Sequence, residues 1–292
     1  MECKPKCKPP VEVHPMEIVR KCQKKFLSKQ PLALVLIQIR FTPIMEISRY
    51  VPEIQSALRN LNFPTYNIED SLEITLNQAG IRPSQKQQWL FKSLDEYENI
   101  ALDSQQITYQ SANYDVFENF YEKFDEICDA ILKVIQNFST SVFLQRYGLR
   151  YVDRINPQEF GNSKASIDTY ISSGFNIQKA DIFRNQPKVC KIIQAGEVDI
   201  LDEKKGPLAF RLTQGESGLT LPLDLMRKSP KLKKQFNAKD NIGFIDIDHS
   251  YQPLNGEKYD KIELKRMFYA MHDNVHNLFY SIISKEGVEL WK

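Results

Sequence analysis

Two long amphipathic segments, each preceded by a run of short strand-like segments, constrain the fold more than any other feature of this sequence. Residues 114–138 and 258–284 carry apolar side chains three and four positions apart, which predicts two helices with one buried face. Upstream of each, apolar and polar residues alternate over short stretches, as in strands of a half-buried sheet. We therefore predict an α+β protein in which antiparallel sheets pack on long helices.

The order of the predicted elements is similar in the two halves of the chain, residues 31–140 and 141–292. The predicted strands are residues 31–41, 71–78, 88–94, 97–103, 106–112, 142–155, 189–201, 207–214 and 242–248, and the predicted helices are 47–61, 114–138, 164–172 and 258–284. Each half thus reads β-α-β(3-4)-α, which favours two pseudo-repeats from an internal duplication. Their sheets could join edge to edge into one continuous saddle-like sheet, similar in element order to the fold of the TATA-binding protein. A likeness in fold indicates no function.

Composition and cysteine usage indicate a cytoplasmic protein with no membrane partner. The net charge is +2 over 292 residues, and no apolar run approaches the roughly 20 residues that span a bilayer. The first residues contain Lys and Pro where a signal peptide needs an apolar run, so we expect no export by that route. The five cysteines are scattered and odd in number, which favours reduced thiols over a disulfide framework.

Two segments are basic. Residues 1–30 are predicted to form a partly disordered basic arm, and residues 215–240 a long mobile loop with Lys and Arg concentrated at 227–239. Both are interpreted first as solvated extensions, with contact to nucleic acid or a partner as the alternative. The arm also holds residues that could be drawn as zinc ligands, namely Cys3, Cys7, His14 and Cys22. Their loose spacing, without a Cys-x-x-Cys knuckle, favours incidental thiols, so we expect neither metal nor cofactor.

The segment 142–155 has a regular spacing of positive charge. Its β-branched and aromatic residues favour a strand, and Gly148 disfavours a helix. Side chains alternate between the two faces of a strand, so Arg146, Arg150 and Arg154 share one face, while Tyr147 and other apolar residues share the opposite face. On the first strand, Arg40 falls on the face opposite the apolar positions as well.

The strand 242–248 offers carboxylates of complementary charge, because Asp246 and Asp248 share one of its faces. These groups could pair with the arginines across the sheet as a structural ladder of charges. Alternatively, the arginines could form a surface that receives phosphate or carboxylate groups, which the guanidinium fork binds well. Both interpretations can hold at once, and the candidate binding residues are Arg40, Arg146, Arg150, Arg154, Asp246 and Asp248.

A metal-dependent hydrolase is an alternative interpretation. His272 and His276 lie four positions apart on the last predicted helix and so share a face. Together with Asp246 and Asp248 they could hold a cation against a phosphoester. A histidine at the border of an apolar stripe is more often simply packed, and the sequence contains no dinucleotide-binding glycine motif, phosphate-binding loop or nucleophile elbow.

Several motifs, taken together, are similar to those of one known family. They are the strand from Pro31 to Phe41, Trp89, the aromatic helix Tyr114–Phe138, the group Arg146, Gly148, Leu149, Arg150 and Tyr151, and the ending with Met271, His272, Phe279 and Trp291. On these residues the chain, over about 30–292, resembles a sporadically distributed family of uncharacterised bacterial and archaeal proteins sometimes labelled "sporadTIGR". The resemblance implies no activity, cofactor or site residue. The patchy occurrence of that family suggests mobile or defence-type gene neighbourhoods.

The sequence thus predicts a non-enzymatic binding or adaptor module with no catalytic residue assigned. Its partner is expected to be another protein or a second copy of the chain, because exposed sheet edges favour dimers. A metal-dependent hydrolase acting on phosphoesters or nucleic acid, and direct nucleic-acid binding through the arm and the 227–239 loop, remain the alternatives.

Overall fold

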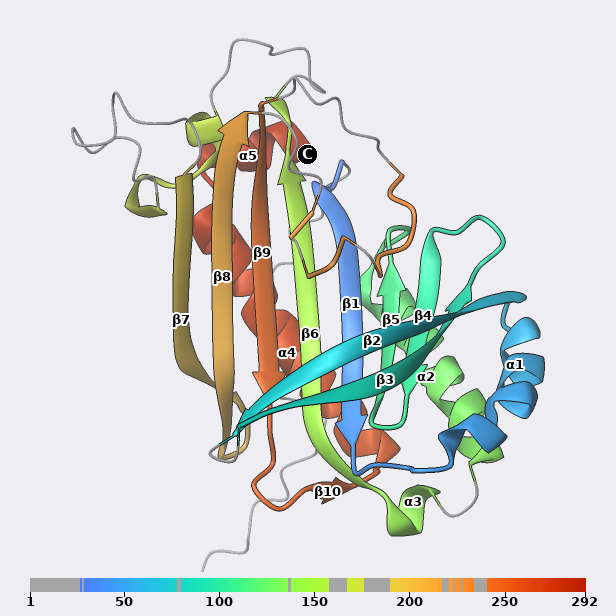
Figure 1. Ribbon diagram of the computed structural model, residues 1–292. Helices are drawn as coiled ribbons and strands as arrows, with labels where there is room; N and C mark the ends of the chain where they lie inside the picture. The colour runs from blue at the N-terminus through green and yellow to red at the C-terminus, as the bar shows by residue number, and fades with distance from the viewer. Residues whose placement is uncertain are drawn as a thin grey trace, which may run out of the picture.

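The computed structural model describes residues 27, 29–77, 80–135, 138–157, 167–175, 190–216, 221–222, 224–226, 228–233 and 241–292. It is an α+β structure in which one large antiparallel sheet packs against helices (Figure 1). The strands are β1 (Leu32–Phe41), β2 (Thr65–Asn77), β3 (Gly80–Lys92), β4 (Glu98–Asp103), β5 (Gln106–Ser111), β6 (Phe143–Ile155), β7 (Cys190–Leu201), β8 (Lys204–Glu216), β9 (Asn241–Tyr251) and β10 (Glu257–Lys258). The helices are α1 (Val51–Arg59), α2 (Phe117–Val134), α3 (Phe138–Ser141), α4 (Lys261–Ile282) and α5 (Lys285–Trp291), with short 3-10 turns η1 (Ile47–Arg49), η3 (Ile167–Tyr170) and η4 (Ser173–Phe175).

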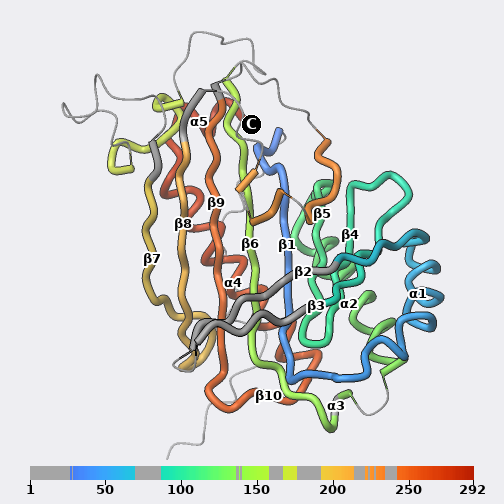
Figure 2. The backbone as a smooth tube through the Cα atoms, viewed as in Figure 1, coloured from blue at the N-terminus to red at the C-terminus, as the bar shows by residue number. Residues whose placement is uncertain are grey.

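The two opening strands of the halves, β1 and β6, pair with each other at the centre of the sheet. The strand order is β2-β3-β4-β5-β1-β6-β9-β8-β7, with β10 pairing β6 outside this path. The β1–β6 ladder places Ile37 opposite Leu149 and Arg40 opposite Arg146. Figure 2 shows the blue β1 beside the green β6. The halves therefore share one continuous sheet, as the sequence allowed.

The helices cover one face of this sheet and bury the main core. Alternate residues of β1, such as Val35, Ile37 and Ile39, are fully buried against this layer. Their partners include the apolar stripes of α2 and α4, with Phe124 and Phe268 meeting edge to face at 5.8 Å between ring centroids. In Figure 1, α4 lies behind β9 and β6. None of the described helices is long and apolar enough to cross a membrane.

The opposite face carries a second, smaller apolar cluster. On the sheet it consists of Leu34, Leu36, Val152, Ile242 and Phe244. It is covered by residues 221–233, which we call the strap; within it, 223 and 227 are not described. In Figure 1 the strap is the orange trace that passes over β6 and β1. The predicted mobile loop at 215–240 therefore has a packed central part.

Most predicted elements are confirmed, and several bounds differ. β2 begins at Thr65 rather than residue 71, and α2 ends at Val134 rather than residue 138, because Ile135 is extended. β3 begins at Gly80 rather than residue 88, because a long hairpin with β2 extends the ladder over a polar stretch. Of the predicted helix 164–172, the residues 167–170 form a 3-10 turn, and 158–166 lie outside the described residues. The closing helix ends at Ile282, because Ile283 is extended, and Ser284 then caps α5 by accepting a hydrogen bond from the Gly287 amide.

Little of the predicted basic arm at 1–30 is described. Leu27 is buried in the main core, and the Lys29 amide donates to the Trp291 carbonyl oxygen at 3.0 Å. The C-terminal end of the predicted arm thus packs onto the domain. The proposed zinc set of Cys3, Cys7, His14 and Cys22 lies outside the described residues.

Candidate arginine-lined face of the sheet

β6 is extended along its whole length, so its three arginines share the face away from the helices. Tyr147 and Leu149, on the other face, are buried in the main core. The ladder with β9 has no bulge from Tyr147 to Ile155, so side chains alternate between the two faces without interruption over this stretch. Because the strap lies on the same face as the arginines, we call this face the strap side of the sheet.

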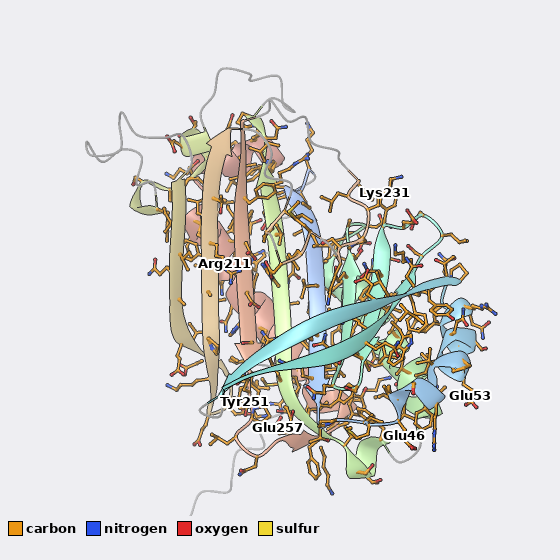
Figure 3. The ribbon with its side chains drawn as sticks, in the orientation of Figure 1. Glu46, Glu53, Arg211, Lys231, Tyr251 and Glu257 are labelled. Carbon is orange, nitrogen blue, oxygen red and sulfur yellow. The ribbon has the colours of Figure 1, made fainter. Side chains whose placement is uncertain are left out.

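Arg150 binds two carboxylates. Its Nε and Nη2 donate to the two carboxylate oxygens of Asp246 at 2.7 and 2.8 Å. Its Nη1 donates to Asp224 of the strap at 2.5 Å. Arg211, on β8, donates to the same Asp246 at 2.9 Å and is labelled in Figure 3. Two cations and two anions thus alternate in one network that is balanced in charge.

Burial and ion pairing fix the charge state of this network. Burial of Arg150 opposes its protonated form, but hydrogen bonds and charges of Asp246 and Asp224 outweigh it and raise the pKa of Arg150. The hydrogen bond from Arg150 in turn lowers the pKa of Asp224. The side chain of Asp246 is only 2% exposed, so this pair is a buried structural unit. Arg150 and Asp246 therefore fit the first interpretation from the sequence, in which charged groups pair across the sheet for structural reasons.

Arg146 and Arg40, which we call the arginine pair, have different surroundings. The two residues lie directly opposite each other on β6 and β1, and both are partly exposed. Arg146 Nη1 donates to the neutral side-chain oxygen of Gln38 at 2.7 Å. Among the described residues, a carboxylate oxygen of Asp248 lies 3.8 Å from Arg146 Nη2. The described surroundings thus set two positive charges against one loosely placed carboxylate.

Gly148 shapes the position of the Arg146 guanidinium. A Cβ atom at residue 148 would lie 2.5 Å from Arg146 Nη1, closer than such atoms can approach. The missing side chain therefore lets the guanidinium lie flat along the strand, over the sheet and next to Gln38. Gln38 is held in place by donating from Nε2 to Thr108 Oγ1 at 2.9 Å. The polar groups next to the Arg146 guanidinium in this direction, Gln38 and Thr108, are thus neutral.

Among the described residues, positive charge exceeds negative charge around Arg146. Burial lowers the pKa of Arg146, the charges of Arg40 and Arg150 lower it further, and Asp248 opposes this effect. Mutual repulsion of neighbouring guanidinium groups is relieved by an anion placed between them. The arrangement can therefore bind a carboxylate or phosphate group.

The third predicted arginine lies at the far end of the strand. Arg154 is buried, opposite Phe244 of β9, and its amide donates to the Pro31 carbonyl oxygen at 2.8 Å. It lies two residue pairs beyond the Arg150 network along the strand. The structure therefore does not join all four predicted arginines in one site.

The metal site drawn from the sequence is not assembled. His272, on α4, stacks on Phe117 at 4.1 Å between ring centroids, and its Nδ1 lies 3.1 Å from the Tyr151 hydroxyl. These contacts are on the helix side, whereas Asp246 binds Arg150 on the strap side. The sheet thus separates the histidines from the aspartates. The described residues contain no group of three or more His, Cys, Asp or Glu placed to hold a metal ion.

Asp153 is a carboxyl group buried within the sheet. It lies on β6, is 6% exposed and lies opposite Ile245 of β9. Burial raises the pKa of Asp153 from 3.8 to about 8, and the charge of Asp246 adds to this effect. Burial thus favours the protonated form of this carboxyl group in the folded protein.

Sequence reasoning missed four contributors to this face. Arg211 lies within a strand that was predicted, where alternation with Phe210 and Leu212 would have placed it on the strap side. Gln38 could have been found in the same way from its neighbours on β1. Asp224 could not, because nothing in a loop sequence says where the loop packs. Gly148 was interpreted only as evidence against a helix.

No protein-family model matches this sequence, and no curated protein matches it either. The resemblance to the sporadically distributed family therefore stays an expectation drawn from the motifs.

Proposed function

We propose that this protein is a binding or adaptor module that receives an anionic group of a partner protein on the arginine pair. The observation that carries the proposal is the imbalance of charge at Arg40 and Arg146. Arg150 and Asp246 complete each other at hydrogen-bond distance, whereas Arg146 has a neutral amide at 2.7 Å and a carboxylate only at 3.8 Å. A partner carboxylate would supply the missing charge.

The geometry supports a binding module better than the alternative hydrolase. That enzyme would need Asp246 and Asp248 to act together with His272 and His276, and the sheet lies between the two sets. Asp246 is also committed to Arg150 and Arg211. The candidate residues thus have structural or anion-binding surroundings.

An acidic segment of a protein is favoured over nucleic acid as the partner. The two arginines of the pair are half-buried on their strands, which suits a single carboxylate better than a continuous phosphate backbone. The described part of the basic 227–239 loop contains the half-buried Lys228 and the exposed Lys231 and Lys233. These lysines are the basis for nucleic-acid binding as the second candidate. Figure 3 shows Lys231 far from Arg211, towards β4.

The test is a titration with a fluorescein-labelled octaglutamate peptide, followed by fluorescence anisotropy. We expect binding by the wild-type protein and at least a tenfold loss of affinity in the double variant Arg40→Gln/Arg146→Gln, because a charge-assisted hydrogen bond contributes about 1.5–3 kcal/mol. The matched control is Arg49→Gln/Arg266→Gln, which removes two exposed arginines elsewhere. Equal affinities of all three proteins would refute the proposal.

A labelled single-stranded DNA of about 20 nucleotides serves as the second probe. Binding of the DNA in preference to octaglutamate, with a steep decrease as salt rises and a loss in the same double variant, would assign the arginine pair to nucleic-acid phosphates.

We also propose that the two halves derive from an internal duplication and form a saddle-like sheet in a cytoplasmic bacterial protein. Support comes from the strand order: each opening strand, β1 or β6, is flanked by a late strand of its own half, β5 or β9, and only the two-residue β10 follows β9. In each half the long helix α2 or α4 then follows.

A further inference from the structure

We propose that the groove beneath the strap is a docking site for a partner segment in which an acidic residue precedes a leucine, and that the strap is an internal occupant of this groove. By this groove we mean the surface of the sheet that the strap contacts, which consists of the apolar patch of β1, β6 and β9 and of Asn99 on β4. This inference goes beyond the proposed function, because it concerns Arg150 and the apolar patch rather than the arginine pair.

The strap fills the apolar part of the groove with leucines. Leu221 and Leu225 are each 6% exposed and contact the patch made by Leu34, Leu36 and Val152. The two leucines are four residues apart, and a local turn, in which the Leu225 amide donates to the Pro222 carbonyl oxygen at 2.9 Å, brings both onto the patch. The strap thus packs on the sheet through these buried leucine side chains rather than through a regular ladder of backbone hydrogen bonds.

An acidic side chain of the strap occupies the charged part of the groove. Asp224 binds the buried Arg150 while its own side chain is 61% exposed. Asp246 of the sheet holds the Arg150 guanidinium in a fixed orientation. Asp224 then binds the remaining side of that guanidinium, as the carboxylate of a ligand would. Asp224 directly precedes Leu225 in the sequence. The groove would therefore recognise an acidic residue followed by a leucine.

Two buried side-chain oxygens beneath the strap accept no hydrogen bond from the described residues. Asn99 is fully buried, and its Nδ2 donates to the Lys228 carbonyl oxygen at 2.9 Å. Its Oδ1 has no hydrogen-bond donor in the part of the chain that the structure describes, and the same holds for Oε1 of Gln110, the residue opposite it in the ladder. Buried acceptors without donors cost free energy. An extended partner segment could supply backbone N–H donors there, so the strap is an incomplete occupant and can be displaced.

The C-terminal part of the strap is attached by Leu232, which packs against the apolar cluster, and by a few polar contacts. Besides the bond from Asn99, the Lys231 amide donates to the Glu96 carbonyl oxygen at 2.8 Å, and Lys231 Nζ lies 5.7 Å from the centre of the Tyr97 ring. Few such contacts need to break for the strap to leave, whereas the sheet beneath it is held by continuous ladders on both sides.

The experiment uses the full chain and a fluorescein-labelled peptide with the sequence of residues 220–231, TLPLDLMRKSPK, as the probe. We expect weak binding by the wild-type protein, in which the attached strap competes. In Leu225→Ala, where the strap has lost an anchor, the peptide should bind at least tenfold more tightly. A peptide with Asn in place of its Asp should lose most of this gain, because it cannot complete the charge on Arg150.

Two further measurements keep the proposal falsifiable. If Leu225→Ala does not fold cooperatively, Asp224→Asn replaces it, with an expected gain of about three- to fivefold, since that side chain is exposed and its loss leaves the core intact. Hydrogen exchange of the Lys231 amide should accelerate when the peptide is added, because the displaced strap leaves the Glu96 carbonyl oxygen. Equal affinities of wild type and the weakened variant, or affinity indifferent to the Asp of the peptide, would overturn the proposal. A concentration-dependent dimer with exchanged straps would overturn it too, since the occupant would then be a second copy.

The outcome is separable from that of the proposed function. Arg40→Gln/Arg146→Gln should abolish octaglutamate binding and leave the affinity for the strap peptide within about twofold. Loss of strap-peptide binding in that variant, with octaglutamate binding unaffected, would place the acidic docking point at the arginine pair and refute the assignment to Arg150.

Discussion

Replacing Asp153 by Asn should remove a large pH dependence of stability. The carboxyl group has a pKa of 3.8 when exposed, and burial among the strands raises the pKa to about 8 in the folded protein. Between these values the folded state keeps a proton that the unfolded state releases. The stability contributed by this group is therefore fully present below pH 3.8 and is lost as the pH rises to about 8.

The magnitude follows from the difference between the two pKa values. Each pH unit in this window removes about 1.4 kcal/mol from the free energy of unfolding, which amounts to about 4 kcal/mol between pH 3.8 and pH 7. Asn resembles the protonated carboxyl group in shape and does not titrate. The unfolding free energy of Asp153→Asn minus that of the wild type should therefore grow by about 2.7 kcal/mol from pH 5 to pH 7.

Urea unfolding at pH 5, 6 and 7, followed by the fluorescence of the buried Trp89 and Trp291, measures this difference. The control is Asp199→Asn, whose carboxylate is 78% exposed and pairs with Lys205 at the surface. This control should run parallel to the wild type over the same range. Parallel curves for Asp153→Asn as well would show that Asp153 is ionised in the folded protein, and the reasoning from burial would be refuted.

Three further predictions concern the strap side of the sheet. Gly148→Ala should weaken octaglutamate binding at least fivefold with little change in melting temperature, because the new methyl group displaces the Arg146 guanidinium; unchanged anisotropy titrations would contradict this. Asp246→Asn should lower the free energy of unfolding by about 3–5 kcal/mol, since it leaves buried Arg150 with an incomplete partner, and urea unfolding will show whether the loss is smaller. Asp224→Asn should cost less than about 1 kcal/mol in the same assay because that carboxylate is mostly exposed, and a loss as large as that of Asp246→Asn would mean that the strap is integral to the fold.

Local patterns in the sequence were sufficient for most strands and for the face on which charged residues lie. Alternation along 142–155 placed Arg146 and Arg150 correctly, because an extended backbone leaves only two directions for a side chain. The same reasoning put Asp246 on a face of its strand, and the ladder then brought it to Arg150. These inferences depend only on geometry within a strand or between neighbouring strands.

What the sequence could not provide was the relation between distant segments. The hydrolase hypothesis joined His272 to Asp246 because the two lie close in sequence, but a helix that packs on one face of a sheet cannot reach residues on the other. The partner of Arg150 on the strap, Asp224, depends on where a loop without periodicity crosses the sheet. The contrast between Arg146 and Arg150 is likewise a matter of angstroms, 3.8 against 2.7 Å to a carboxylate oxygen, which no pattern of residue types encodes.

The pairing of β1 with β6 has a consequence for how this protein could be divided. Since the boundary between the halves is a ladder from Leu32 to Phe41, cutting the chain near residue 140 would bare one long hydrogen-bonding edge on each fragment. Such fragments would be expected to associate with each other or with themselves rather than remain as single soluble units. If one half was once a separate gene product, its natural state would have been a symmetric pair joined along this same edge, and fusion of the two copies would have made that association permanent.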